Sequence, residues 1–146
     1  MRQSWEEYFL TLARHVSTRA TCDRLHAGCV LVRDKRILST GYNGSLPGAD
    51  HCEDVGHLLM NGHCVATEHA ERNAVANAAR AGVSTLDATA FVTHTPCWDC
   101  IKHLAAAGIK LIIYKIEYRN ARSTHPPNIK EILKKAGVEL RRFRKR

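Results

Sequence analysis

Two short motifs on either side of residues 72–95 constrain this chain more than any other part of the sequence. The first motif is His69-Ala70-Glu71, and the second is Pro96-Cys97-Trp98-Asp99-Cys100. One imidazole and two thiolates suit Zn²⁺, and three protein ligands leave the fourth tetrahedral position open. An open metal position beside a carboxylate is the composition of a hydrolytic site, because the metal activates water and the carboxylate moves protons.

The spacing within each motif assigns the ligands. Cys97 and Cys100 stand three residues apart, so a helix carries both thiolates on one face. His69 and Glu71 stand two apart, roughly 200° around a helix, so they cannot bind one metal from the same side. We therefore predict that His69 binds the metal with the two cysteines and that Glu71 acts on the bound water. Both motifs are typical of helix N-termini, whose partial positive charge favours thiolate and hydroxide.

The composition indicates one compact domain over residues 1–146, with 45% hydrophobic and 25% charged residues. No apolar run approaches the ~20 residues that cross a membrane, so we expect no membrane association. The N-terminus is charged and then amphipathic, unlike a secretory leader, and we expect a cytoplasmic protein. In that reducing compartment, six cysteines beside nine histidines favour metal binding over disulfides.

The formal net charge of +8 is concentrated at one end of the chain. Residues 141–146 hold five of these charges, which leaves +3 for the rest. This distribution favours a solvated basic tail over a nucleic-acid-binding surface, although binding of a phosphate, nucleotide or polynucleotide stays open.

Periodicity and capping predict the order of the elements. A capping box at Ser4-x-x-Glu7 begins a helix over 4–20. Strands at 29–32 and 36–40 form a hairpin around a charged turn, and 42–66 is a long loop without periodicity. There follow a helix capped by Thr67 and ending at Gly82, a strand at 88–94, a helix from Pro96 to near Gly108, a strand at 110–116, a helix from Pro126-Pro127 to near Gly137, and a strand at 138–143. This order predicts an α/β fold: a three-layer α/β/α sandwich around one mixed five-stranded sheet, with both metal-bearing helices at one sheet edge.

The motif pair is the signature of zinc deaminases, and the chain resembles deoxycytidylate (dCMP) deaminases over almost its whole length. The segments that carry the resemblance are Gly41-Tyr42-Asn43-Gly44, residues 51–57, Asn61-Gly62-His63-Cys64, residues 69–74, Val92-Thr93-His94, Pro96-Cys97, residues 107–110 and Tyr118-Arg119-Asn120. The resemblance implies a cytidine-deaminase-like fold and hydrolysis of dCMP to dUMP and ammonia, which supplies dUMP for thymidylate synthesis. It also implies a homo-hexamer that dCTP with Mg²⁺ activates and dTTP inhibits.

The resemblance extends to individual residues. It implies Zn²⁺ on His69, Cys97 and Cys100, with Glu71 passing a proton from water to the ring N3 and then to the departing amine. Asn43 is a candidate contact for the deoxyribose, since its amide both donates and accepts; an ordinary Asn-Gly turn is the alternative. Further candidates for substrate binding are His63, His94, Thr95, Tyr118 and Arg119. Candidates for effector binding are Gly28, Asn43 and Gly44.

A second group of metal-binding residue types lies in and near the long loop. Four of them could form a closed zinc site that orders residues 42–66, and we predict Cys22, Cys52, His57 and Cys64, with His63 as a substitute. Related deaminases often have Cys where this chain has His57. The alternative is that these residues are isolated packing or surface positions. Cys29 lies in an apolar strand and is predicted to be a buried small side chain.

Two other functions stay open at this point. The chain could be a zinc deaminase that acts on tRNA adenosine, on polynucleotide cytidine or on a free base, although an aromatic content of 6% is low for a surface that stacks bases. It could also be a zinc-stabilised binding module without catalysis. Glu71 argues against that module, because a structural zinc site does not need the carboxylate.

Overall fold

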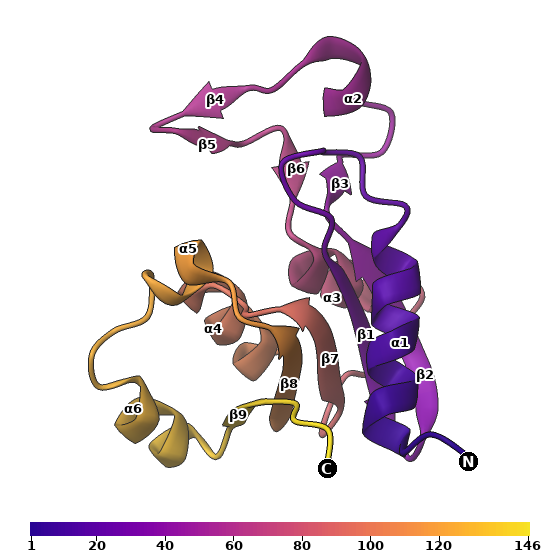
Figure 1. Cartoon of the computed structure of the whole chain (residues 1–146), viewed down its shortest axis with the longest axis vertical. Helices are drawn as coiled ribbons and strands as arrows, with labels where there is room; N and C mark the ends of the chain where they lie inside the picture. The colour runs from indigo at the N-terminus through magenta and orange to yellow at the C-terminus, as the bar shows by residue number, and fades with distance from the viewer.

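The computed structural model describes all residues, 1–146, and contains one mixed sheet of five strands in the order β2-β1-β7-β8-β9 (Figure 1). The strands are β1 (Gly28–Arg33), β2 (Arg36–Tyr42), β7 (Thr89–His94), β8 (Leu111–Ile116) and β9 (Glu139–Arg142). β1 runs antiparallel to both β2 and β7, whereas β7, β8 and β9 are parallel. The predicted mixed five-stranded sheet is confirmed.

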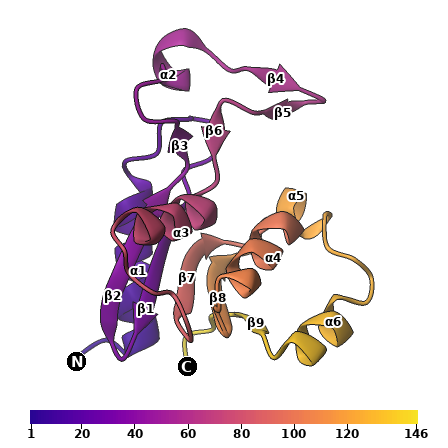
Figure 2. The same ribbon diagram turned by 180° about the vertical axis from the view of Figure 1, so that it is seen from behind.

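Helices cover both faces of this sheet. α1 (Trp5–Ser17) lies on one face, and α3 (Ala70–Arg80), α4 (Trp98–Ala106) and α6 (Ile129–Ala136) lie on the other (Figures 1 and 2). Because successive strand residues point to opposite faces, Val30 and Val32 pack with α1 while Cys29 and Leu31 pack with α3 and α4. Two hydrophobic cores result, one per face, as the three-layer sandwich requires. Cys29 is fully buried, as predicted.

Local signals position the first elements. The Ser4 side chain accepts a hydrogen bond from the Glu7 N–H at 3.2 Å, so α1 begins at the predicted capping box. In the β1–β2 turn, Asp34 and Lys35 adopt φ values of 52° and 61°, which matches the right-handed twist of a two-residue hairpin. At the other end of the chain, Gly137 ends α6 in the left-handed conformation, at φ 70°.

A glycine lets α3 approach the sheet closely. A Cβ on Gly41 of β2 would lie 2.3 Å from the Ala70 carbonyl oxygen and 2.3 Å from the Ala74 nitrogen. Any larger residue would therefore push α3 away from the sheet. Since α3 carries the His-x-Glu motif in its first turn, this contact sets how far that motif lies from the sheet.

The stretch predicted as a loop contains short elements. They are β3 (Gly44–Ser45), α2 (Cys52–Val55), β4 (Leu59–Met60) and β5 (His63–Cys64), and β6 (Thr67–Glu68) follows directly after the stretch. Residues 46–66, here called the arm, project from the sheet edge (Figures 1 and 2). The prediction that Thr67 caps α3 is wrong. Thr67 pairs with Ser45 in β6, and His69 is the N-cap residue of α3. The short helix α5 (Arg119–Arg122) was not predicted.

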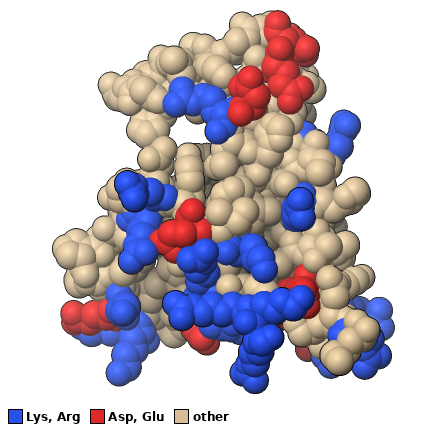
Figure 3. All heavy atoms as spheres, in the orientation of Figure 1, with Lys and Arg blue, Asp and Glu red and all other residues tan.

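The basic C-terminal segment is only partly a tail. Arg141 and Arg142 lie in β9, and Phe143 is buried beside α1. The Arg141 guanidinium forms a two-pronged ion pair with Glu6, and Lys145 lies 3.2 Å from Glu7. Figure 3 shows Lys and Arg side chains gathered in the lower half of this face, over β8, β9 and the chain end. Among the helices, none is long and apolar enough to cross a membrane.

Candidate zinc site and active-site cleft

The two predicted motifs meet at one edge of the sheet. His69 is the N-cap of α3 and Cys97 is the N-cap of α4, and neither side chain caps its own helix. The His69 Nδ1 lies 3.2 Å from the Cys100 Sγ and 3.6 Å from the Cys97 Sγ. Tetrahedral zinc, with bonds of about 2.0–2.3 Å, places neighbouring ligand atoms about 3.5–3.8 Å apart. The three residues therefore fit zinc in both chemistry and spacing, and no fourth protein ligand closes the site.

Hydrogen bonds within the cluster lower the pKa of one thiol. The Cys100 thiol and the His69 ring both hydrogen-bond to Cys97, and with the Cys100 N–H they lower the pKa of Cys97 to about 4. Conversely, the contact with Cys97 and burial raise the pKa of Cys100. The start of α4 thus stabilises a thiolate, which is the form that binds metal.

Glu71 lies against the cluster without belonging to it. Its side chain is buried, with 6% exposed, and contacts Cys100, yet it is not among the three clustered ligands. Burial raises the pKa of Glu71 above the usual glutamate value, so the carboxyl binds a proton more readily than an exposed one. A buried carboxyl of this kind can accept and return protons next to a metal.

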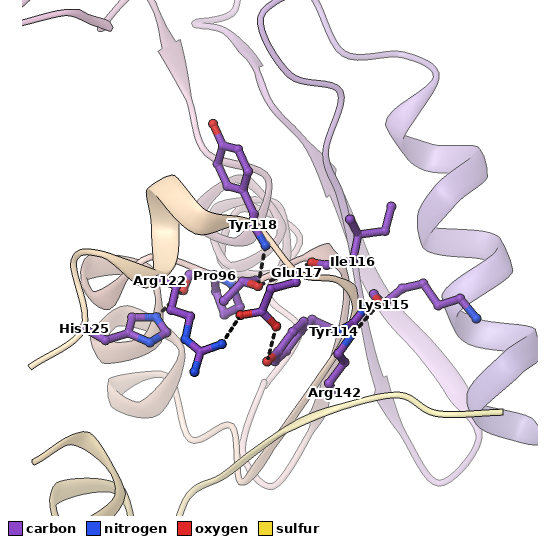
Figure 4. A network of polar contacts seen from close by, with 10 residues as sticks. Pro96, Tyr114, Lys115, Ile116, Glu117, Tyr118, Arg122, His125 and Arg142 are labelled. Carbon is purple, nitrogen blue, oxygen red and sulfur yellow. Dashed lines mark hydrogen bonds and ion pairs between the residues drawn. The ribbon is translucent and has the colours of Figure 1, made fainter. Parts of the chain in front are cut away.

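The segment after α5 supports the turn that carries Cys97. The Thr124 hydroxyl accepts a hydrogen bond from the Trp98 N–H at 2.8 Å, and the His125 Nε2 contacts the Pro96 carbonyl at 2.8 Å. The Thr95 hydroxyl accepts from the Tyr118 N–H at 2.8 Å and so joins this turn to the end of β8. Figure 4 shows the His125 ring pointing toward Pro96. Sequence reasoning missed Thr124 and His125, because they approach the motif through tertiary structure alone.

A cleft of about 730 Å³ opens over the cluster. Its lining includes five of the predicted substrate residues, namely Asn43, His63, His94, Thr95 and Tyr118. Arg119 is not part of the lining, whereas Arg24 and Asn120, which were not predicted, are. The cleft thus draws residues from the arm, from the segment before β1 and from the ends of β7 and β8.

Two of these residues have defined local environments. The Asn43 Oδ1 accepts from the Ala27 N–H at 2.7 Å, and its Nδ2 donates to the Leu25 carbonyl at 2.6 Å. Asn43 therefore holds the segment before β1 in place, with one donor and one acceptor position of its amide still free. The His94 ring packs edge-to-face on Tyr118, and burial lowers the pKa of His94.

The predicted effector residues have other neighbours. A Cβ on Gly28 would lie 2.1 Å from the Ala13 carbonyl oxygen, so Gly28 allows α1 to pack closely on β1. Gly44 lies beside the Tyr42 ring. Their binding of an effector stays a prediction.

Comparison with known proteins decides the family. The sequence profile of the cytidine and deoxycytidylate deaminase zinc-binding region matches residues 3–116. The chain belongs to this family. The predicted class of enzyme, a zinc-dependent deaminase, is thereby confirmed, and so is the cytidine-deaminase-like fold.

Individual relatives of this deaminase support the same assignment. The chain is 42% identical to ComE operon protein 2 of Bacillus subtilis over 95% of its own length and 71% of that protein. It is 33% identical to the deoxycytidylate deaminase of Saccharomyces cerevisiae, of which it spans 46%. The dCMP deaminase of cyanophage S-TIM5, whose crystal structure contains dCMP and dUMP, matches with a TM-score of 0.79 and 30% identity, covering 98% of this chain and 99% of the phage chain.

A second cluster lies where the arm meets the body of this deaminase. The ligand atoms of Cys22, Cys52, His57 and Cys64 all lie within 4.8 Å of one another. The Cys22 Sγ is 3.5 Å from the His57 Nδ1, and the Cys52 Sγ is 3.6 Å from the Cys64 Sγ. These spacings again suit tetrahedral zinc. His63, the predicted substitute, lies in the cleft lining and not in this cluster.

Proposed function

We propose that this protein hydrolyses dCMP to dUMP and ammonia, and thereby supplies dUMP for thymidylate synthesis. The observation that carries the proposal is the three-ligand cluster with a buried, non-ligating Glu71 at the floor of a large cleft. The likeness to a phage dCMP deaminase whose structure holds dCMP and dUMP supports this choice of substrate.

The chemistry divides between a metal and a carboxyl group. When His69, Cys97 and Cys100 hold Zn²⁺, the ion supplies a Lewis acid with an open position that makes water nucleophilic near neutral pH. The Glu71 carboxylate takes a proton from the attacking water and gives it to N3 of cytosine as oxygen adds to C4. Glu71 then transfers the second water proton to the amino group, which leaves as ammonia while the C4 carbonyl of uracil forms.

Basic and polar residues of the cleft lining belong to the proposal as the groups that hold the nucleotide. Arg24 donates one guanidinium N–H to the Gly62 carbonyl at 3.1 Å, which leaves other N–H groups for a phosphate. His63 from the arm and Tyr118 from the end of β8 line the same cleft. We assign the 5′-phosphate to Arg24, His63 and Tyr118, and the deoxyribose to the free positions of the Asn43 amide.

A second zinc ion at Cys22, Cys52, His57 and Cys64 belongs to the proposal. Four protein ligands leave no open position, so the role of this ion is structural. It would hold the arm, which carries His63, against the segment that carries Arg24. The ion therefore stabilises one wall of the cleft.

Effector control and assembly complete the proposal. We propose that a homo-hexamer responds to dCTP with Mg²⁺ and to dTTP. A second cavity, of about 340 Å³, lies on the α1 side of the sheet and is lined by Arg14, His26 and Lys115 among others. His94 lines this cavity as well as the cleft. Arg14 and Lys115 bring two cationic side chains to this cavity, and such side chains suit the phosphates of an effector.

The decisive experiment is dCMP deamination by zinc-loaded protein, followed by loss of cytosine absorbance with and without dCTP and Mg²⁺. We expect conversion to dUMP, and much slower conversion of deoxycytidine, which lacks the phosphate. A zinc-loaded protein that leaves dCMP intact but deaminates tRNA adenosine or a polynucleotide would contradict the proposed substrate.

A further inference from the structure

His57 in the arm cluster uses both of its ring nitrogens. Its Nδ1 lies 3.5 Å from the Cys22 Sγ, and its Nε2 lies 2.9 Å from the Asp23 Oδ1. Cys22 and Asp23 are neighbours in the chain. One dipeptide of the body thus contacts both edges of an imidazole that belongs to the arm.

The contact with Asp23 determines which ring nitrogen of His57 carries the proton and which can bind a metal. A neutral imidazole has one N–H and one lone pair, and a metal ion takes the lone pair. If Asp23 accepts the Nε2–H, the lone pair stays on Nδ1, which is the nitrogen that faces the thiols. A protonated His57 would have no lone pair, so an ordinary ion pair with Asp23 would be incompatible with metal binding.

His57 is the one member of the cluster that needs such a partner. The three cysteines bind metal as thiolates and carry no second nitrogen that must be oriented. The Asp23 side chain is 71% exposed and that of His57 is 26% exposed, so their contact by itself contributes little to folding. We expect this contact to act mainly on the orientation of the His57 ring as a metal ligand.

We infer that Asp23 is a positioning residue for the arm cluster, whose carboxylate orients His57 so that Nδ1 binds the metal. This inference rests on the proposed second zinc ion. Asp23 also lies between Cys22 and Arg24, and Arg24 contacts the arm at Gly62. The 22–24 segment therefore supplies a metal ligand, the group that orients another ligand, and a side chain of the substrate cleft.

The test measures zinc affinity of the arm site in the full-length protein. Elemental analysis of the wild type should give two zinc ions per chain. Zinc affinity is then measured by competition with the chelator 4-(2-pyridylazo)resorcinol, and the zinc ion that Cys52→Ser no longer binds is the one at the arm site. Asp23→Ala should weaken this site by about 10- to 100-fold. Asp23→Asn should weaken it less, because the amide oxygen still accepts from Nε2–H. Asp54→Ala, which removes an exposed carboxylate of α2, is the matched control and should leave the affinity unchanged.

A second set of variants, made in a protein that already carries His57→Cys, tests whether Asp23 acts by orienting His57 or has a general structural role. In His57→Cys, the thiolate needs no partner, so adding Asp23→Ala should have no further effect on zinc affinity. An equal loss in both backgrounds would overturn the inference, as would an Asp23→Ala protein with wild-type affinity. If His57→Cys does not hold its second zinc, nitrogen-15 spectra of the histidine rings replace it. The protected Nε2 proton of His57 should then be present in the wild type and lost in Asp23→Ala; its persistence would also overturn the inference.

The zinc count keeps the two hypotheses apart. One zinc ion per chain in fully loaded wild type would remove the second zinc and the role of Asp23 with it. Two zinc ions with an unaffected Asp23→Ala would remove only the role of Asp23. Turnover of dCMP is measured independently of both results.

Discussion

His69 and Glu71 stand two residues apart, and the structure gives them different environments. His69 lies 3.2 Å from the Cys100 sulfur, while Glu71 is buried beside the cluster and stays outside it. The spacing predicted this division on the assumption that both side chains lie on a helix. In the structure only Glu71 lies in α3, whereas His69 is its extended N-cap. The environment of Asn43 could not be predicted in the same way. Its amide bonds Leu25 and Ala27, and that pairing depends on how the segment before β1 folds back.

Glu71→Gln tests the division between ligand and proton carrier. The amide keeps the size of the side chain but cannot carry protons between water, N3 and the amino group. We expect kcat for dCMP to fall by about 10²–10⁴-fold or more, while the catalytic zinc content is unchanged. Elemental analysis and steady-state kinetics check both points, with Glu131→Gln on α6 as a control. Loss of zinc from a well-folded Glu71→Gln protein would show that Glu71 is a ligand.

At the scale of elements, the sequence predicted those that have a repeating pattern or a cap. The helix from the Ser4 capping box, the hairpin and the strand–helix alternation after residue 88 all follow from local rules. The arm lacked such a pattern because its order comes from contacts between distant residues. Its ligand cluster joins Cys22 to residues 52–64, and its short strands span two residues each. Neither feature leaves a periodic mark in the sequence.

Arg24→Ala tests whether the arm side of the cleft holds the phosphate. We expect KM for dCMP to rise roughly 10- to 100-fold, because a hydrogen bond to a charged group is worth ~1.5–3 kcal/mol. The rate with deoxycytidine should change little, since that substrate has no phosphate. Kinetics with both substrates provide the measurement, and Arg80→Ala at the end of α3 is the control. An equal effect on both substrates would place Arg24 in a purely structural role.

At the scale of the whole molecule, the order of helices and strands was sufficient to predict a sheet covered on both faces. The packing of the C-terminal segment against α1 was not predictable, because Arg141 pairs with Glu6, which lies 135 residues earlier in the chain. A run of basic residues looks like a solvated tail until its acidic partners are known. The same charges that suggested a tail close the C-terminal segment onto α1.

Arg141→Met tests this closure through the pH dependence of stability. The hydrogen bond from Arg141 lowers the pKa of Glu6 below its ordinary value of 4.5. The pair therefore stabilises the fold fully above pH 4.5, and its contribution is lost as pH falls through the lowered pKa. Because both side chains are about one-third exposed, we expect a cost of roughly 0.2–1 kcal/mol at pH 7. Urea unfolding at pH 7 and pH 3 checks this, with Arg144→Met as the control; the same cost at both pH values would exclude the ion pair as the cause.

The arm has a consequence for how this protein opens. Outside the cysteine–histidine cluster, few polar contacts tie the arm to the body, among them the Arg24–Gly62 hydrogen bond and a 3.4 Å bond from Glu53 N–H to the Thr21 carbonyl. A segment with so few contacts unfolds locally at a much lower free energy than the sheet. The second zinc ion that we propose for the cluster would oppose that opening by mass action. Zinc availability would then set how often the arm detaches while the catalytic core stays folded, so amide hydrogen exchange in the arm would report metal occupancy and exchange in β7 would report global unfolding.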